Sequence, residues 1–417
     1  MRLRGVAALL AVMLAGCGGE SDGGPGGVDG GVAGADVPGA ADVGAASDVT
    51  GADDAVMDAL GDVLLDARGD ARGDADATAV DATVAVDAAD DGTGGDAGQP
   101  PEDAGAPDVH SPDYPLDDVL RLNHLQALGT HNSYHVQPPD TTLSDWAYSH
   151  EPLDVQLGAQ GVRQFELDVH LEPPVGFTVK HIPILDGVTT CETLHECLTV
   201  VLKWSDAHPG HHAIFILIEP KDEVDPVKLK GHIAELDAAI LEVWDRSRVL
   251  TPDDVRGGFP TLREAIIAEG WPTLGQTRGK LVVTLLDSGA HRDEYLVGHP
   301  SLEGRVMFAD GGVNDAWAGI LLLDDPVGDA DAIAEAVSAG FIVRTRGDTD
   351  HGTLVEKQVG RRDAALKSGA HMISSDYPAP VEGIDYVCEI PGGTPSRCNP
   401  VTAPAECTSA DIEALGL

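Results

Sequence analysis

Residues 162–171 read VRQFELDVHL, an apolar run that carries two carboxylates two positions apart, Glu166 and Asp168. Its β-branched and aromatic residues favour an extended strand, in which residues i and i+2 point to the same face. Glu166 and Asp168 would therefore lie side by side on one face of a buried strand. Because neighbouring carboxylates repel each other, we expect a cation or a proton beside them.

Seven further short apolar runs resemble residues 162–171. They are LQALGT (125–130), FTVKHI (177–182), AIFILIEP (213–220), LVVTLLD (281–287), RVMFAD (305–310), GFIVRTR (340–346) and HMISSDYP (371–378). Amphipathic stretches of helical length separate several of them, at residues 193–209, 226–246, 329–340 and 353–369. Eight strands alternating with helices predict an α/β fold, a distorted (β/α)8 barrel of TIM type. An open doubly wound sheet is the alternative, which the absence of a glycine-rich phosphate loop after an early strand disfavours.

The 417 residues divide by composition into three parts. Residues 1–16 hold two arginines and a short apolar run, which predicts a signal peptide. Residues 17–112 are nearly all Ala, Gly, Asp, Val and Pro, which predicts a disordered tether. Residues 113–417 hold every aromatic side chain, enough for the core of a single barrel domain.

The end of the predicted signal peptide, Leu14-Ala15-Gly16-Cys17, resembles the lipobox of bacterial lipoproteins. The resemblance implies cleavage before Cys17 and lipid attachment to its sulfur, while an ordinary secretory signal is the alternative. We therefore expect an exported protein, anchored by lipid to the bacterial outer membrane or cell surface, or secreted. We also expect a monomer. The net charge of −44 argues against a nucleic-acid partner, because the predicted barrel is acidic as well as the tether.

Export makes disulfides possible. Cys191 and Cys197 lie six residues apart and could close a small loop at a helix start. Cys398 and Cys407 could close a second loop, which leaves Cys388 over. The partners of these last three cysteines stay open at this point.

Polar side chains end most of the predicted strands, where barrels of this type place their catalytic groups. Asn132 follows the first strand and Glu219 ends the apolar run of residues 213–220. Together with Glu166 and Asp168 they form an all-oxygen set, which suits a hard cation such as Ca²⁺ or Mg²⁺ rather than zinc. The alternative is a salt-bridged barrel rim.

Two histidines also end predicted strands. His131 ends the first and His181 the third, so we expect them on opposite sides of the strand that carries the carboxylates. Two imidazoles beside a cation suit acid–base cleavage of a phosphodiester, since histidine changes charge near neutral pH. A structural, hydrogen-bonded role is the alternative for each. His135, further into the loop, is expected to be a supporting or surface residue.

Four of these motifs occur in a specific order along the chain. THNSYH (130–135), FELDVH (165–170), KHIPI (180–184) and ILIEPK (216–221) resemble the X-region of phosphoinositide-specific phospholipases C, and their order matches the calcium-dependent members. The later IVRTRGD, ISSDYP and RCNPV resemble a secreted bacterial branch of that family. The resemblance implies one Ca²⁺ ion, held by Asn132, Glu166, Asp168 and Glu219, with His131 and His181 catalytic.

The resemblance also implies the reaction and its partner. A phospholipid at a membrane surface, phosphatidylinositol, would be cleaved to diacylglycerol and an inositol (cyclic) phosphate. Lys221 and Arg344 are candidates for contacts to phosphate or inositol, Arg346 is a weaker one, and Tyr377 is a candidate for stacking on the inositol ring. Rim ion pairs are the alternative for the cations.

Three other functions stay open. A glycerophosphodiester phosphodiesterase is also a metal-dependent barrel, but His-Arg-Gly is typical of its first strand end, where this chain has His131-Asn132-Ser133. The second is an enzyme acting on another phosphodiester or head group. The third is a non-catalytic surface lipoprotein that binds lipid or sugar. The presence of all six candidate site residues argues against this last function.

Overall fold

The computed structural model describes residues 114–139, 146–222, 225–349, 354–392 and 395–413. The predicted signal peptide, Cys17 and the predicted tether lie outside these residues, so all three stay predictions. Among the helices of the described residues, none combines the length and the apolar character that crossing a membrane requires.

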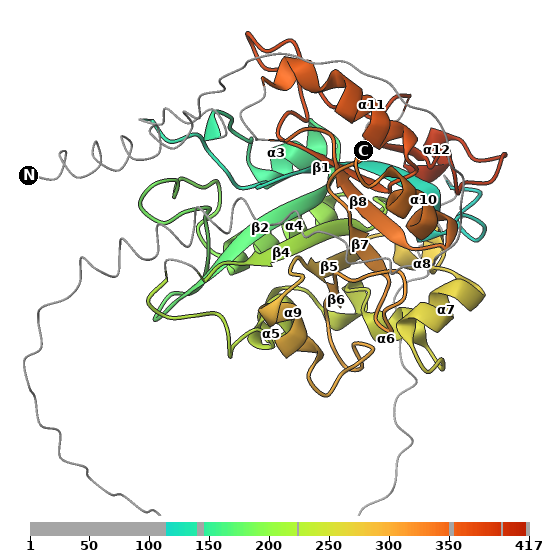
Figure 1. Cartoon of the computed structure of the whole chain (residues 1–417), viewed down its shortest axis with the longest axis horizontal. Coiled ribbons are helices and arrows are strands. Elements are labelled where there is room, and N and C mark those ends of the chain that lie inside the picture. The colour runs from blue at the N-terminus through green and yellow to red at the C-terminus, as the bar shows by residue number, and fades with distance from the viewer. Residues whose placement is uncertain (1–113, 140–145, 223–224, 350–353, 393–394, 414–417) are drawn as a thin grey trace, which may run out of the picture. The chain divides into compact units, whose positions relative to one another are not determined.

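Eight parallel strands form a nearly closed barrel (Figure 1), as predicted. Their hydrogen-bonded order is β6 (Phe308–Ala309), β5 (Leu281–Leu285), β4 (Ile214–Pro220), β2 (Val162–Glu172), β1 (Leu125–Thr130), β9 (Met372–Ser375), β8 (Ile342–Arg346) and β7 (Ile320–Leu322). No ladder in the described part of the chain joins β6 to β7. The Asp310 carboxylate after β6 bridges this seam by accepting a hydrogen bond from the Leu322 backbone N–H at 3.0 Å.

One predicted barrel strand is wrong and one was missed. Residues 177–182 were expected to form the third barrel strand, but β3 (Gly176–Val179) pairs antiparallel with the end of β2 and stands outside the barrel order. Only three residues separate β2 from β3, whereas a parallel pair needs a crossover of about a dozen residues or more. The missed strand is β7, which has only three residues. A short strand β10 (Ser396–Cys398) pairs antiparallel with β1.

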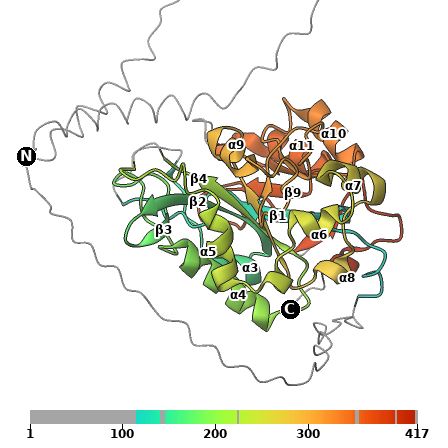
Figure 2. The same ribbon diagram turned by 90° about the horizontal axis from the view of Figure 1, so that it is seen from below.

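Helices cover the outside of the barrel (Figure 2). They are α3 (Leu153–Gly158), α4 (Leu194–Ala207), α5 (Glu235–Val243), α6 (Pro252–Arg256), α7 (Leu262–Glu269), α8 (Leu274–Thr277), α9 (Ala290–Leu296), α10 (Ala330–Ser338), α11 (Val359–Lys367) and α12 (Ser409–Ile412). Short 3-10 turns lie at Leu122–His124, Arg246–Arg248 and Val355–Gln358.

Each of the four predicted helical stretches contains a helix, and two of these helices begin later than predicted. Thr193 caps α4 by accepting a hydrogen bond from the Glu196 N–H at 3.1 Å, and the helix ends just before Pro209. The helix predicted over residues 226–246 is only α5, because Gly231 has a φ of 94°, which a right-handed helix cannot include. The stretch predicted over residues 353–369 divides into the last 3-10 turn and α11.

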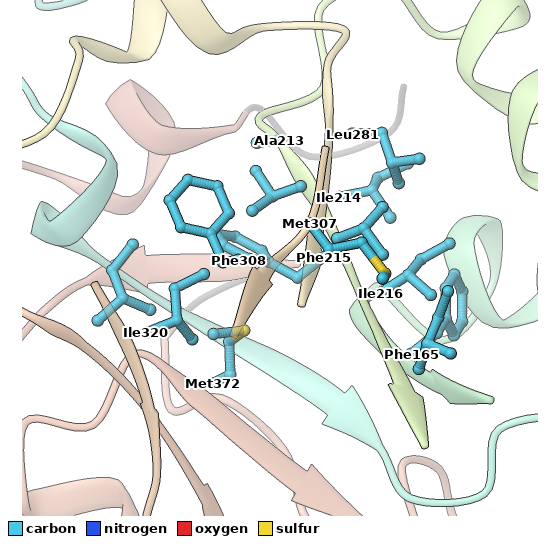
Figure 3. Packing of buried hydrophobic residues seen from close by; sticks show 14 of the residues in the cluster. Phe165, Ala213, Ile214, Phe215, Ile216, Leu281, Met307, Phe308, Ile320 and Met372 are labelled. Carbon is cyan, nitrogen blue, oxygen red and sulfur yellow. The ribbon is translucent and has the colours of Figure 1, made fainter. Parts of the chain in front are cut away.

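Apolar side chains fill the half of the barrel interior that lies toward the amino ends of the strands. Phe215, Phe308, Ile320 and Met372 come from four different strands and pack together there (Figure 3). The interior becomes polar toward the carboxyl ends of the strands. On β2, Gln164 precedes Glu166 and Asp168 on the same face, and a side chain at Gly129 would lie 2.0 Å from the Gln164 amide oxygen. The glycine therefore lets β1 and β2 meet directly below the polar end.

Ion pairs fasten both ends of the described chain to the opposite, amino end of the strands. Arg278, just before β5, pairs with Asp117 at 2.6 Å and lies over the ring of Tyr114 at 3.4 Å. Arg163, at the start of β2, binds the carboxylate of Glu413 through Nε at 3.1 Å.

Both predicted disulfides are present. Cys191 bonds to Cys197 with an S–S length of 2.05 Å, and Cys398 bonds to Cys407 at 2.00 Å. Cys388 is a buried free thiol.

Candidate active site

Three carboxylates meet at the carboxyl end of the barrel. Glu166 and Asp168 project from the same face of β2, and the register between β2 and β4 sets Asp168 directly beside Glu219. Each carboxylate offers one oxygen that lies within 4.8 Å of the others. The structure thus brings together three of the four predicted metal ligands, here called the acid triad.

Burial raises the pKa of two members of the acid triad, Glu166 and Glu219. Desolvation raises the pKa of Glu166 to about 8, an effect that Arg344 opposes and that Glu219 and Asp168 increase. Desolvation also raises the pKa of Glu219 to about 7, although 30% of its side chain is exposed. Lys221 opposes this rise and Asp168 adds to it. When no metal ion is bound, the pKa values of these two carboxyls therefore lie near neutral pH, well above their ordinary value.

The triad fits a hard cation. Asp168 is fully buried, and among the described residues neither of its oxygens has a hydrogen-bond partner. A buried carboxylate without hydrogen bonds is costly, and a Ca²⁺ ion coordinated by oxygen ligands would satisfy it. Asn132, the fourth predicted ligand, is buried in the turn after β1 with a φ of 42°. Its neighbour Ser133 donates its backbone N–H to the Glu166 carbonyl at 2.9 Å, and Asn132 stays a predicted ligand.

Two cations neutralise the triad from opposite sides. Lys221 pairs with Glu219, and its Nζ lies 3.5 Å from Asp168 Oδ2. Arg344, fully buried on β8, pairs with Glu166 and Asp324. Both had been predicted to contact substrate. The structure shows them in ion pairs with acidic residues, and their substrate contacts stay predictions.

His131 is held by a carboxylate from the neighbouring strand. Its Nδ1 lies 2.9 Å from Asp376 Oδ1, just after β9. Its Nε2 lies 3.6 Å from Glu166 Oε1 and 3.4 Å from Nη1 of Arg346. The other guanidinium nitrogen of Arg346 reaches Asp376 at 3.4 Å. The predicted catalytic histidine therefore lies beside the triad, with Arg346 close behind it.

His181 reaches the site on the β2–β3 hairpin and not on a barrel strand. Its Nδ1 lies 2.8 Å from Asp186 Oδ2, and 21% of its side chain is exposed. The backbone at this point is fixed by His170, whose Nε2 lies 2.9 Å from the Lys180 carbonyl oxygen and 3.1 Å from that of His181. A positive charge on His181 is one of the influences that oppose the raised pKa of Glu219, so this histidine and the triad are close enough to interact electrostatically.

Sequence reasoning missed the two carboxylates that hold these histidines. Asp376 had a signal, because it follows a predicted strand directly. Asp186 had none, because it lies in an irregular loop. Hydrogen bonds from His135 and His181 hold the pKa of Asp186 below its ordinary value although burial opposes this. His135 is buried against Asp186, so it is not a surface residue, and its supporting role stays a prediction.

Tyr377 has partners of its own. It is half-buried, and its ring meets the ring of Tyr386 edge-on at 5.9 Å. Burial raises its pKa to about 12. Its predicted stacking on inositol stays a prediction.

In both site histidines Nδ1 is the nitrogen that lies beside the orienting carboxylate. When a carboxylate accepts a hydrogen bond from Nδ1–H, the lone pair lies on Nε2, which is then the atom that exchanges protons. The site therefore contains two imidazoles poised for proton transfer beside a set of three carboxylates.

Comparison with known proteins agrees with this geometry. Residues 120–177 and 173–400 match the family model described as phosphoinositide phospholipase C, Ca²⁺-dependent. No curated protein matches this chain in sequence.

The solved structures similar to this chain include three phospholipases C. A Ca²⁺-dependent phosphatidylinositol-specific phospholipase C from Streptomyces antibioticus shares 19% identity over 62% of this chain and 95% of its own, with a TM-score of 0.47. A calcium-dependent phosphoinositol-specific phospholipase C from Pseudomonas sp. shares 18% over 68% and 97%, with a TM-score of 0.48. A mutant of the phosphatidylinositol-specific phospholipase C from Staphylococcus aureus shares 15% over 66% and 92%, with a TM-score of 0.43.

The family match covers well over half of the chain and includes the acid triad and both site histidines. The chain therefore belongs to the family of Ca²⁺-dependent phosphoinositide phospholipases C, phosphodiesterases whose cofactor is Ca²⁺.

Proposed function

We propose that this enzyme cleaves the bond between phosphorus and the glycerol oxygen of phosphatidylinositol, giving diacylglycerol and an inositol phosphate. One observation carries the proposal. Two imidazoles, each held at Nδ1 by a carboxylate, stand beside the acid triad at the carboxyl end of the barrel. Such a pair supplies a base and an acid to the same phosphodiester.

One histidine would act as the general base and the other as the general acid. One Nε2 takes the proton of the inositol 2-hydroxyl while that oxygen forms a bond to phosphorus. The other, protonated at Nε2, gives its proton to the glycerol oxygen as the bond from phosphorus to that oxygen breaks. Diacylglycerol leaves, and the inositol phosphate is cyclic. Opening of the cyclic phosphate by water would use the same two groups with their roles exchanged.

The remaining residues would set the charge of the site. Asn132, Glu166, Asp168 and Glu219 would hold Ca²⁺, which supplies a Lewis acid that lowers the pKa of the hydroxyl and stabilises charge on the phosphoryl oxygens. Ca²⁺ binding would favour the deprotonated forms of Glu166 and Glu219, whose pKa values are raised by burial. Lys221, whose ammonium is partly exposed beside the triad, is then the nearest candidate for a phosphate oxygen.

The cellular setting is also part of the proposal. The Leu14–Cys17 motif supports export and lipid anchoring at the bacterial envelope. The substrate would then be met at a membrane surface.

The test is ³¹P NMR of phosphatidylinositol vesicles incubated with the full chain. We expect cyclic or free inositol phosphate signals in Ca²⁺, none in EGTA and few in Mg²⁺. Glycerophosphoinositol serves as the second substrate, because only the lipid yields diacylglycerol. Preferred turnover of glycerophosphoinositol would establish a glycerophosphodiester phosphodiesterase instead, and full turnover in EGTA would remove Ca²⁺ from the reaction.

Two variants separate metal binding from proton transfer. Glu166→Gln should weaken Ca²⁺ binding measured by calorimetry, whereas His181→Ala should leave binding intact and reduce turnover. Equal Ca²⁺ affinity in wild type and Glu166→Gln would take Glu166 out of the ligand set. If His131→Ala left every measured phenotype intact, the non-catalytic lipoprotein would be favoured.

A further inference from the structure

Asp186 is shared by two imidazoles. His135 Nε2 lies 2.9 Å from Asp186 Oδ1 and 3.0 Å from Oδ2, while His181 Nδ1 lies 2.8 Å from Oδ2. The two rings meet edge-on, with centroids 6.5 Å apart. Asp186 and His135 are fully buried, and His181 is the member that reaches solvent. Asp186 therefore connects the buried imidazole of His135 to the imidazole of His181, which substrate can reach.

The surroundings of His135 fix its tautomer. Its Nδ1 is buried and has no hydrogen-bond partner among the residues that the structure describes. A proton on Nδ1 would be a buried donor without an acceptor, which is costly, so the proton lies on Nε2. His135 therefore donates to Asp186, and the carboxylate keeps its remaining capacity for the Nδ1–H of His181.

The backbone allows His135 little freedom. Its N–H donates to the Asn132 carbonyl at 2.8 Å, its carbonyl accepts from the His150 N–H at 2.9 Å, and its ring lies against Tyr148 with centroids 4.4 Å apart. His150 also holds the other end of this turn, because its Nε2 lies 2.8 Å from the His131 carbonyl oxygen. One five-residue turn, residues 131–135, thus carries His131 itself and the donor that holds the partner of His181.

The backbone of Asp186 is closed by a small loop, but its carboxylate is not. Ile182 and Asp186 exchange two backbone hydrogen bonds, at 2.8 and 3.1 Å. These backbone bonds do not hold the Asp186 carboxylate, and within the described residues only His135 and His181 hydrogen-bond its oxygens. Without the donor on His135, the carboxylate would be held only by the ring it has to orient.

We propose that His135 is a positioning residue, which through Asp186 holds the ring of His181 in the tautomer and orientation that present Nε2 to the substrate. This inference rests on the proposed function and assigns a task within it. It couples the two proton-transferring histidines mechanically, since the turn that carries one determines the support of the other.

The test compares two replacements of His135. His135→Phe keeps a ring against Tyr148 but removes the donor, whereas His135→Gln restores an N–H donor near the position of Nε2. We expect His135→Phe to lower kcat for phosphatidylinositol by about 10- to 100-fold with KM changed by less than about twofold, as is typical when a supporting hydrogen bond behind a functional imidazole is lost. His135→Gln should restore kcat to within about threefold of wild type, because it replaces that hydrogen bond. Equal losses in both variants would overturn the proposal.

A second background guards against a Phe variant that does not fold. In Asp186→Asn, adding His135→Phe should cause no further fall in kcat, because the path through the carboxylate is already broken. Losses that multiply would show that His135 acts by another route and would overturn the proposal.

Ring-nitrogen NMR of His181, assigned with His181→Ala, needs no substrate and separates this proposal from the proposed function. Wild type and His135→Gln should show a single tautomer with the proton on Nδ1, and His135→Phe should show a mixture. That pattern in a protein inactive on phosphatidylinositol would refute the proposed function and leave the positioning intact. An active enzyme whose His181 signals are unchanged in His135→Phe would refute the positioning alone.

Discussion

The guanidinium of Arg344 and the carboxylate of Glu166 form an ion pair across the barrel interior, with 1% and 2% of their side chains exposed. Arg344 comes from β8 and Glu166 from β2, so the pair crosses the space between strands that are not neighbours. A charge buried this deeply contributes through its partner, because water cannot replace the partner when it is removed.

Replacing Arg344 by Met should therefore be costly, and the cost should depend on Ca²⁺. We expect a loss of about 3–5 kcal/mol in the free energy of unfolding in EGTA, the range for a broken buried ion pair. Saturating Ca²⁺ should recover part of it, because Glu166 would then face a bound cation. Urea unfolding with and without Ca²⁺ measures both values. Arg292→Met is the control, since Arg292 pairs with the exposed Asp293 and should cost less than about 1 kcal/mol. A loss that Ca²⁺ does not change would separate Arg344 from the metal site.

The raised pKa values of Glu166 and Glu219 predict that the pH dependence of stability differs with and without metal. A carboxyl whose pKa rises from 4.5 to about 8 on folding stabilises the folded state at low pH, and this contribution is lost as pH rises through that window. In EGTA the melting temperature should fall between about pH 5 and pH 8. In Ca²⁺ it should fall less or rise, because binding releases the protons and strengthens as pH rises.

Scanning calorimetry at several pH values in both buffers checks this prediction. Glu166→Gln is the matched variant, because its amide does not titrate. It should flatten the fall seen in EGTA. An identical pH profile for wild type and Glu166→Gln would mean that other groups cause the fall.

Asp376→Asn should damage turnover and spare the metal site. The amide is similar in size, but it can present a donor to His131 Nδ1 and so favour the tautomer with the proton on Nε2. We expect kcat to fall by about 10²- to 10⁴-fold, in line with the contribution of a general acid or base. Ca²⁺ affinity measured by calorimetry should be unchanged, since Asp376 is not one of the predicted metal ligands. Asp363→Asn, on the exposed side of α11, should have no effect on either quantity.

The barrel and the acid triad could be predicted because both follow from periodicity. Glu166 and Asp168 share a face because they lie two residues apart on a strand. Glu219 ends an apolar run, where a carboxylate is unfavourable unless it binds something. The error at β3 arose because a short apolar run predicts a strand but not the strand with which it pairs. Such a run occurs in hairpins as well as in barrels. The three residues of β7 were too few to show any period.

The support of the histidines could not be predicted for a different reason. Asp186 is brought to His181 and His135 by loop backbone, and no spacing rule connects residues in an irregular loop. Asp376 is the opposite case, since its position after a strand was visible although its partner was not. Loop contacts of this kind depend on tertiary packing and leave no local signature.

Truncation should show where the folded domain begins. Deleting residues 18–110 should leave the unfolding free energy unchanged, because Tyr114 and Asp117 are retained. Deleting residues 18–117 removes both, leaves the buried Arg278 without its carboxylate and should cost about 3 kcal/mol or more. Urea unfolding of the two deletions gives the comparison. A large loss in the shorter deletion would show that part of residues 18–110 packs on the barrel.

The ion pairs at Arg278 and Arg163 have a practical consequence for orientation. They secure both ends of the described chain at the pole of the barrel opposite the acid triad. A barrel coupled to a bead, a sensor chip or any other support through either end would turn its reacting groups outward, toward whatever approaches from the far side. A tag or a fused domain at either end would likewise stand clear of the substrate.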